Sequence, residues 1–109
     1  MTNTKQAHMI AEYYGLDSQM SVAQEECAEL IQALSKLRRA LCKLSLSGVS
    51  EPRGAEYIAA RSHVVEEMAD VSILLKQLTH LLECDELLKF MITQKLGRTV
   101  YRMGAGHEN

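Results

Sequence analysis

Two stretches of the sequence repeat apolar residues with a three- or four-residue spacing, over about six helical turns in the first and about five in the second, and this periodicity limits the folds open to the chain. The first stretch carries Val22, Leu30, Ala33, Leu34, Leu37, Leu41 and Leu44. The second carries Val64, Val71, Leu74, Leu75, Leu78, Leu81 and Leu82. Two long amphipathic helices joined by a short loop pack most economically antiparallel, and their wide apolar faces need further helices to cover them. The pattern therefore predicts a helical bundle.

Glycine and capping residues predict where the helices begin and end. Gly15 suits the position just after a first helix, because glycine readily adopts a positive φ. Asp17, Ser18 and Ser21 are alternative N-caps of the second helix, and Ser21 and Gln24 match a capping box. Asp85 is a candidate N-cap of the last helix. The expected elements are helices over residues 4–14, 21–44, 55–82 and 86–103, a loop over 45–54 and a flexible tail over 104–109.

Composition favours an all-α fold. The chain has 109 residues, 47% of them apolar, with a single proline and no tryptophan, and helix-forming residues dominate. A chain of this length buries one core rather than two. We expect a single domain over residues 1–109, built as a four-helix-type bundle that a further copy of the chain completes in a homodimer or homotetramer.

Charge and hydropathy argue against two classes of partner. The formal net charge is −2 with acids and bases interspersed, so we expect no duplex nucleic acid as a partner. No run of about 18 apolar residues is present, so we expect neither a signal peptide nor a membrane span and place the protein in the cytoplasm. Cys27, Cys42 and Cys84 lack metal-ligand spacing and are expected to be buried, reduced thiols.

Carboxylates interrupt both apolar stripes in the same way. On a helical wheel Glu26 lies at the centre of the first stripe and Glu29 at its edge, while Glu67 and Asp70 hold the same two places on the second. The segments EECAELIQAL, from Glu25, and EEMADVSILL also align as a quasi-repeat. If the stripes face each other, four carboxylates converge on one pocket.

Converging buried carboxylates need a positive partner, because each unpaired charge costs several kcal/mol to bury. Lysine or arginine could supply it, but the basic residues of these two segments mostly lie off the stripes. All-oxygen ligation instead favours Mg²⁺, with Mn²⁺ possible, and the lack of a Cys or His pair at ligand spacing argues against zinc. Glu-x-x-His, which carboxylate bundles holding di-iron use, does not occur in the chain.

The motifs EECAE and EMAD resemble the EExxE and ExxD signature of the MazG-like, all-α nucleoside triphosphate pyrophosphohydrolases, and KLGRTVYRM resembles the basic last helix of small members. The resemblance covers roughly residues 19–103. It implies metal ligation by Glu26, Glu29, Glu67 and Asp70, with Glu25 as the leading glutamate of EExxE. The interval between the motifs is longer than is usual in the family. No tryptophan corresponds to the one that holds the base in some relatives, so base specificity is not implied.

The resemblance implies hydrolysis of the α,β-phosphate bond of a nucleoside triphosphate, which gives a nucleoside monophosphate and pyrophosphate. Glu25 and Glu26 are then the candidate catalytic residues, with Glu25 orienting or deprotonating the water; alternatively, Glu25 is a solvated surface glutamate. Glu26 would act through the metal. The candidate substrate contacts are Lys95, Arg98 and Arg102 for the phosphates and Gln19 for the base.

Each of these substrate contacts also has a purely structural interpretation. Basic side chains favour the C-terminal end of a helix and can extend from an apolar surface to solvent. His63 is expected to be a packed or capping residue. Two other functions stay open: a non-catalytic helical-bundle interaction protein with a structural cation, and a nucleotide-binding protein without turnover.

Overall fold

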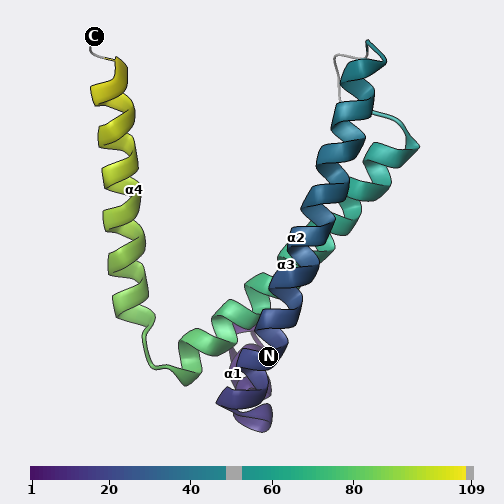
Figure 1. Ribbon diagram of the computed structural model, residues 1–109. Helices are drawn as coiled ribbons and strands as arrows, with labels where there is room; N and C mark the ends of the chain where they lie inside the picture. Colours follow the sequence, from purple (N-terminus) through teal and green to yellow (C-terminus); the bar gives the residue numbers. More distant parts are fainter. Residues whose placement is uncertain (49–52, 108–109) are drawn as a thin grey trace.

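A computed structural model of the protein describes residues 1–48 and 53–107, with side chains as far as Gly104. Within those residues it is built from helices alone: α1 (Asn3–Tyr14), α2 (Leu16–Leu46), α3 (Ala55–Leu81) and α4 (Asp85–His107) (Figure 1). The predicted all-α class is confirmed. Part of the predicted loop, residues 49–52, and the end of the predicted tail lie outside the described residues.

Gly15 alone separates α1 from α2. Its φ of 85° and ψ of 167° belong to a region that residues with a Cβ rarely adopt. The Gly15 N–H donates to the carbonyl of Ala11 at 2.8 Å, and the Gly15 carbonyl accepts from the N–H of Gln19 at 3.0 Å. The second helix therefore begins at Leu16, and the predicted start at Ser21 was wrong: that residue already lies inside α2.

The last helix also differs from its prediction. Asp85 is its first residue rather than its cap, and the carbonyl of Cys84 accepts the N–H of Leu88 at 2.8 Å. The helix continues past Gly104 to His107, so the predicted end near Met103 was wrong. Each glycine costs a helix only about 1 kcal/mol relative to alanine, which is too little to stop an otherwise favourable segment.

The core is a helical hairpin of α2 and α3, with α1 packed across one end of it (Figure 1). Small residues bring the backbones close: Ala33 and Ala40 of α2 are buried, as are Ala7 and Ala11 of α1. Val64 and Leu74 add larger side chains to this core.

Several residues of the predicted stripes lie outside the core. In the single chain Leu34, Leu41, Leu75 and Leu82 remain between 38% and 54% exposed. The predicted burial of the cysteines was wrong for Cys27 and Cys42, which are exposed, whereas Cys84 is half-buried.

The fourth helix stands apart from the others. Among the residues that the structure describes, α4 contacts only the end of α3. The molecule has the form of a V, with α2 and α3 in one arm and α4 in the other (Figure 1). Glu83, in the connection between α3 and α4, has a φ of 51° and turns the chain at the base of the V. Among the described residues, no helix combines the length and the apolar character needed to cross a bilayer.

Candidate metal centre

Three carboxylates from two helices meet on the hairpin. One oxygen each of Glu26 on α2 and of Glu67 and Asp70 on α3 lie within 4.8 Å of one another. Glu67 and Asp70 are three residues apart and so share one face of α3, and the packing of α2 against α3 brings Glu26 opposite them. Both of the predicted acidic pairs contribute to this acidic cluster of Glu26, Glu67 and Asp70.

Two oxygens of the acidic cluster are buried without a hydrogen-bond partner among the described residues: Oε2 of Glu26 and Oε2 of Glu67. Glu67 is only 8% exposed. Its other oxygen, Oε1, lies 3.3 Å from Nε2 of His63, one turn earlier on α3. A buried carboxylate oxygen with no donor is costly, and a bound cation is a physical means of satisfying two such oxygens together.

The surroundings of Glu26 raise its pKa to about 7. Loss of hydration is the main cause, since one carboxylate oxygen is buried, and repulsion from Glu29 and Asp70 adds to it. The nearby carboxylates of Glu67 and Glu29 raise the pKa of Glu26 further, because either can accept the proton that a protonated Glu26 carries. Near neutral pH, a proton therefore resides on the acidic cluster for part of the time.

In the described part of the chain, no lysine or arginine forms an ion pair with the acidic cluster. The pair Lys43–Glu56, at 2.9 Å, lies at the other end of the hairpin and is exposed. This distribution of ion pairs agrees with the expectation that the basic residues lie off the carboxylate stripes.

The outer glutamates of the first motif lie at the edge of the site. Glu29 is exposed and is not one of the three clustered carboxylates, although it is close enough to raise the pKa of Glu26. Glu25 is also exposed and is not part of the cluster. The structure thus brings three of the four predicted ligands together and places the fourth beside them.

A pocket of about 420 Å³ adjoins the acidic cluster, with Glu26 and Asp70 in its wall. Gln19 lines it, is 4% exposed, and has a buried Oε1 without a hydrogen-bond partner among the described residues. Gln77 of α3 also lines it and is 2% exposed. Ile10 and Tyr14 of α1 supply apolar surface. The predicted residue Gln19 therefore lies beside the carboxylates, in a pocket with both polar and apolar walls.

Sequence reasoning missed Gln77. It follows Asp70 by seven residues, or about two helical turns, which places it on the same side of α3. The spacing from Asp70 could have indicated that Gln77 lies near the site. However, a glutamine among leucines can equally be a surface residue, and the sequence does not show which helix packs beside it.

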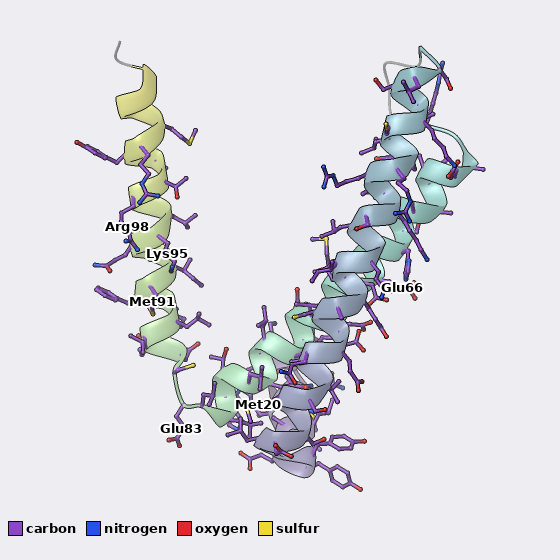
Figure 2. The ribbon with its side chains drawn as sticks, in the orientation of Figure 1. Met20, Glu66, Glu83, Met91, Lys95 and Arg98 are labelled. Atoms are coloured by element: carbon purple, nitrogen blue, oxygen red, sulfur yellow. The ribbon has the colours of Figure 1, made fainter. Side chains whose placement is uncertain are left out.

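The predicted phosphate contacts are not at the site in a single chain. Lys95, Arg98 and Arg102 all lie on α4 and are exposed. Figure 2 shows Lys95 and Arg98 on the α4 arm, well separated from Glu66 on the hairpin arm. They do share one helix, as predicted, but the turn at Glu83 carries that helix away from the acidic cluster.

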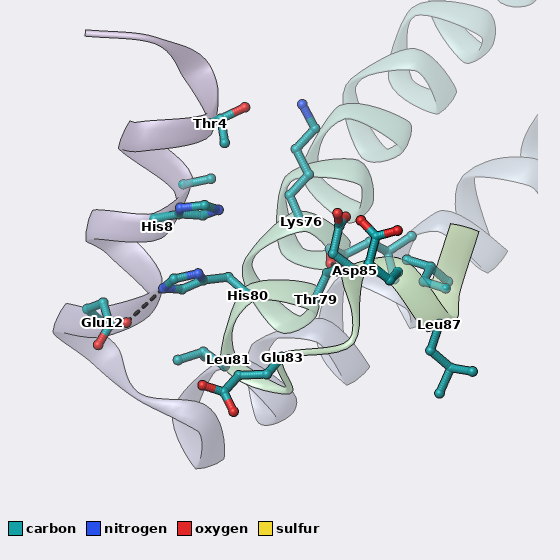
Figure 3. Close-up of a pocket in the computed structure, with 14 residues that line it drawn as sticks. Thr4, His8, Glu12, Lys76, Thr79, His80, Leu81, Glu83, Asp85 and Leu87 are labelled. Carbon is teal, nitrogen blue, oxygen red and sulfur yellow. Dashed lines mark hydrogen bonds and ion pairs between the residues drawn. The ribbon is translucent and has the colours of Figure 1, made fainter. Parts of the chain in front are cut away.

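A larger cavity of about 940 Å³ lies at the base of the V, between α1, the end of α3 and the start of α4 (Figure 3). The rings of His8 and His80 stack there with centroids 3.9 Å apart, and Nε2 of His80 lies 2.7 Å from Oε1 of Glu12. These contacts tie α1 to α3 and so help to fix the helix that forms one wall of the smaller pocket.

Comparison of the chain with protein-family models, with curated proteins and with solved structures gave no match in any of the three.

Proposed function

We propose that the protein is a Mg²⁺-dependent nucleoside triphosphate pyrophosphohydrolase that acts as a homo-oligomer. One observation carries the proposal: two carboxylates of the acidic cluster, Glu26 and Glu67, each have a buried oxygen without a partner among the described residues, and the cluster adjoins a pocket. A volume of about 420 Å³ lies in the range typical of small-molecule sites. The resemblance of EECAE and EMAD to the MazG-like signature suggests which reaction such a site performs.

Glu26, Glu67 and Asp70 would hold the cation, and a rotation of its exposed side chain would allow Glu29 to join them. Carboxylate oxygens are ligands that suit Mg²⁺, and Mn²⁺ accepts the same set. Bound Mg²⁺ supplies charge neutralisation at phosphate oxygens and acidifies water.

The remaining roles belong to the side chains around the acidic cluster. Gln19 and Gln77 offer amide groups that can pair with the edge of a base, and Tyr14 offers a ring against which a base can rest. Glu25, adjacent to Glu26 on α2, would orient or deprotonate the attacking water. Lys95, Arg98 and Arg102 would neutralise the phosphates once α4 is brought to the site.

The test is a panel of ribo- and deoxynucleoside triphosphates incubated with the protein and Mg²⁺, with pyrophosphate and inorganic phosphate assayed separately. We expect pyrophosphate and a nucleoside monophosphate from at least one substrate. Glu67→Gln should lower the rate by about 100-fold or more, because it weakens the cation site, whereas Glu66→Gln should not, since Glu66 is exposed and lies outside the cluster. Release of inorganic phosphate alone would contradict cleavage between the α and β phosphates.

One observation favours a second candidate, a cation- or nucleotide-binding bundle without turnover. Within a single chain the basic residues of α4 lie away from the acidic cluster, and Glu25 is exposed. Such a protein would bind Mg²⁺ and release no product from any triphosphate, so the same panel, together with calorimetry, distinguishes the two.

A further inference from the structure

The last helix has a surface that a helix in water does not normally show. Its large apolar residues are all between 40% and 77% exposed: Leu87, Leu88, Phe90, Met91, Ile92, Leu96, Val100, Tyr101 and Met103. They are distributed around the whole circumference of α4 rather than along one stripe. Because large apolar side chains occur on every side of α4, no orientation of this helix in water covers them, and α4 requires a partner surface.

The size of that missing surface fits a second copy of the chain. A compact protein of 12.2 kDa exposes about 6,100 Å², whereas this chain exposes 8629 Å². Its radius of gyration is 18.3 Å, against about 13 Å for a compact domain of 109 residues. The excess of about 2,500 Å² per chain is what an extensive, obligate type of interface buries.

Charge and register indicate where α4 docks. Lys95 and Arg98 lie about 15 and 20 Å along α4 from its first residue, Asp85, at 1.5 Å per residue. Asp70 and Glu67 lie about 17 and 21 Å back along α3 from its end. An α4 placed antiparallel to an α3 therefore brings its two cations level with two carboxylates of the acidic cluster.

The connection between α3 and α4 indicates whether α4 packs on the α3 of its own chain or on the α3 of a second copy. Only residues 82–84 separate the two helices, and Glu83 directs α4 away from its own hairpin (Figure 1). In a domain-swapped dimer, α4 packs on the partner subunit at the position that it would occupy on its own chain in a closed monomer. The alignment of α4 with α3 is therefore the same in both arrangements, and only the connection between the two helices differs.

We propose that two copies of the chain exchange α4, so that each acidic cluster is faced by Lys95 and Arg98 of the partner subunit. The site is then composite, since one chain contributes the carboxylates and the other the cations. The role of these cations at a phosphate rests on the proposed function; the exchange of helices does not.

The test combines native mass spectrometry of the full chain at micromolar concentration with carbodiimide coupling of a mixture of ¹⁴N- and ¹⁵N-labelled chains, unfolded and refolded together. Carbodiimide joins a lysine directly to a carboxylate that it contacts. We expect a dimer in which links from Lys95 to Glu67 or Asp70 join a ¹⁴N peptide to a ¹⁵N peptide. The pairs Lys43–Glu56, at 2.9 Å, and Lys89–Asp85, at 3.0 Å, are internal controls and should give links within one isotope only.

A monomeric mass would overturn the proposal. So would a dimer whose Lys95 links stay within one isotope, since α4 would then fold back on its own chain, and so would a dimer in which Lys95 gives no link to the acidic cluster. A dimer with mixed-isotope links that releases no pyrophosphate supports the exchange and removes the proposed function instead.

Discussion

Nε2 of His63 lies 3.3 Å from Oε1 of Glu67, so one oxygen of this buried carboxylate has a partner, while the other has none among the described residues. The two side chains are one helical turn apart on α3, and His63 is the more exposed of them. His63 therefore holds Glu67 in place without closing the acidic cluster to a cation.

Replacement of His63 by alanine should destabilise the metal-free protein by about 1 kcal/mol, because Oε1 of Glu67 would lose its contact with the imidazole while Oε2 already lacks a partner among the described residues. Mg²⁺ should recover most of this loss if the ion binds the same carboxylate. Urea unfolding with EDTA and with Mg²⁺ measures both effects. His63→Gln retains a donor and is the matched control; an equal loss in both variants, unaffected by Mg²⁺, would show that His63 contributes only packing.

The pKa of Glu26, raised to about 7 from its ordinary value of 4.5, predicts how stability depends on pH. The folded protein binds more protons than the unfolded chain between these two values, so its free energy of unfolding falls as the pH rises through that interval. The contribution of Glu26 to the free energy of unfolding of the metal-free protein should consequently be larger at pH 5 than at pH 8. Glu26→Gln should remove that component and flatten the profile measured by thermal unfolding in EDTA. An unchanged pH profile in the variant would contradict the raised pKa.

Binding of a divalent cation should release a proton from the acidic cluster. With a pKa of about 7, Glu26 is roughly half protonated at pH 7, and ligation requires the carboxylate form. We expect Mg²⁺ binding to release about half a proton per site at pH 7 and almost none at pH 9. Calorimetric titration in buffers of different ionisation enthalpy measures this number. Glu26→Gln should bind Mg²⁺ more weakly and release none; a release equal to that of the unmodified protein would exclude Glu26 as the source.

The sequence alone predicts those features that depend on interactions between residues close to one another in the chain. It predicts less well the features that depend on distant residues. Leucine periodicity predicted α2 and α3, because a helix that must bury one face carries that requirement in its own residues. The positions of Glu26, Glu67 and Asp70 followed from the same periodicity, since side chains that share a stripe with the core must meet whatever packs against it. Both successes depend only on the hairpin.

The sequence patterns did not determine the features that depend on a single backbone angle or on a helix elsewhere in the chain. Ser21 and Gln24 satisfied the capping pattern, yet Gly15 alone supplied the break and α2 began earlier. The prediction that Lys95 contacts the phosphates was made without knowing where α4 lies, and the turn at Glu83 directs this helix away from the acidic cluster of its own chain. The hydrophobic pattern of α4 required burial but did not specify the surface that provides it.

The backbone of Gly15 should make this position intolerant of any side chain. A Cβ there would meet no atom within 4 Å, so the cost of Gly15→Ala is conformational and is expected to be about 1–3 kcal/mol. Because the break sets the angle at which α1 crosses the hairpin, the pocket wall formed by Ile10 and Tyr14 should also be disturbed. Gly97→Ala is the control for the added methyl group, since Gly97 lies within α4, has no positive φ and in the single chain has open space at its Cβ. That change carries no conformational penalty, so it should cost less than Gly15→Ala. Chemical denaturation of both variants separates the outcomes, and equal stability in the two would show that the Gly15 conformation is not strained for alanine.

Charge placed on the exposed apolar surface of α4 should change the assembly rather than the hairpin. Leu96 is 63% exposed in the single chain, and in an exchanged dimer it would lie among side chains of the partner. Leu96→Glu should therefore shift the protein towards the monomer by tenfold or more in dissociation constant, since a buried unpaired carboxylate costs several kcal/mol. Leu46→Glu is the matched control, because Leu46 is 83% exposed at the far end of α2, away from the acidic cluster. Sedimentation velocity across a concentration series, with helicity followed by circular dichroism, measures the shift. If both substitutions left the dissociation constant unchanged, the apolar surface of α4 would not be the contact that joins two chains.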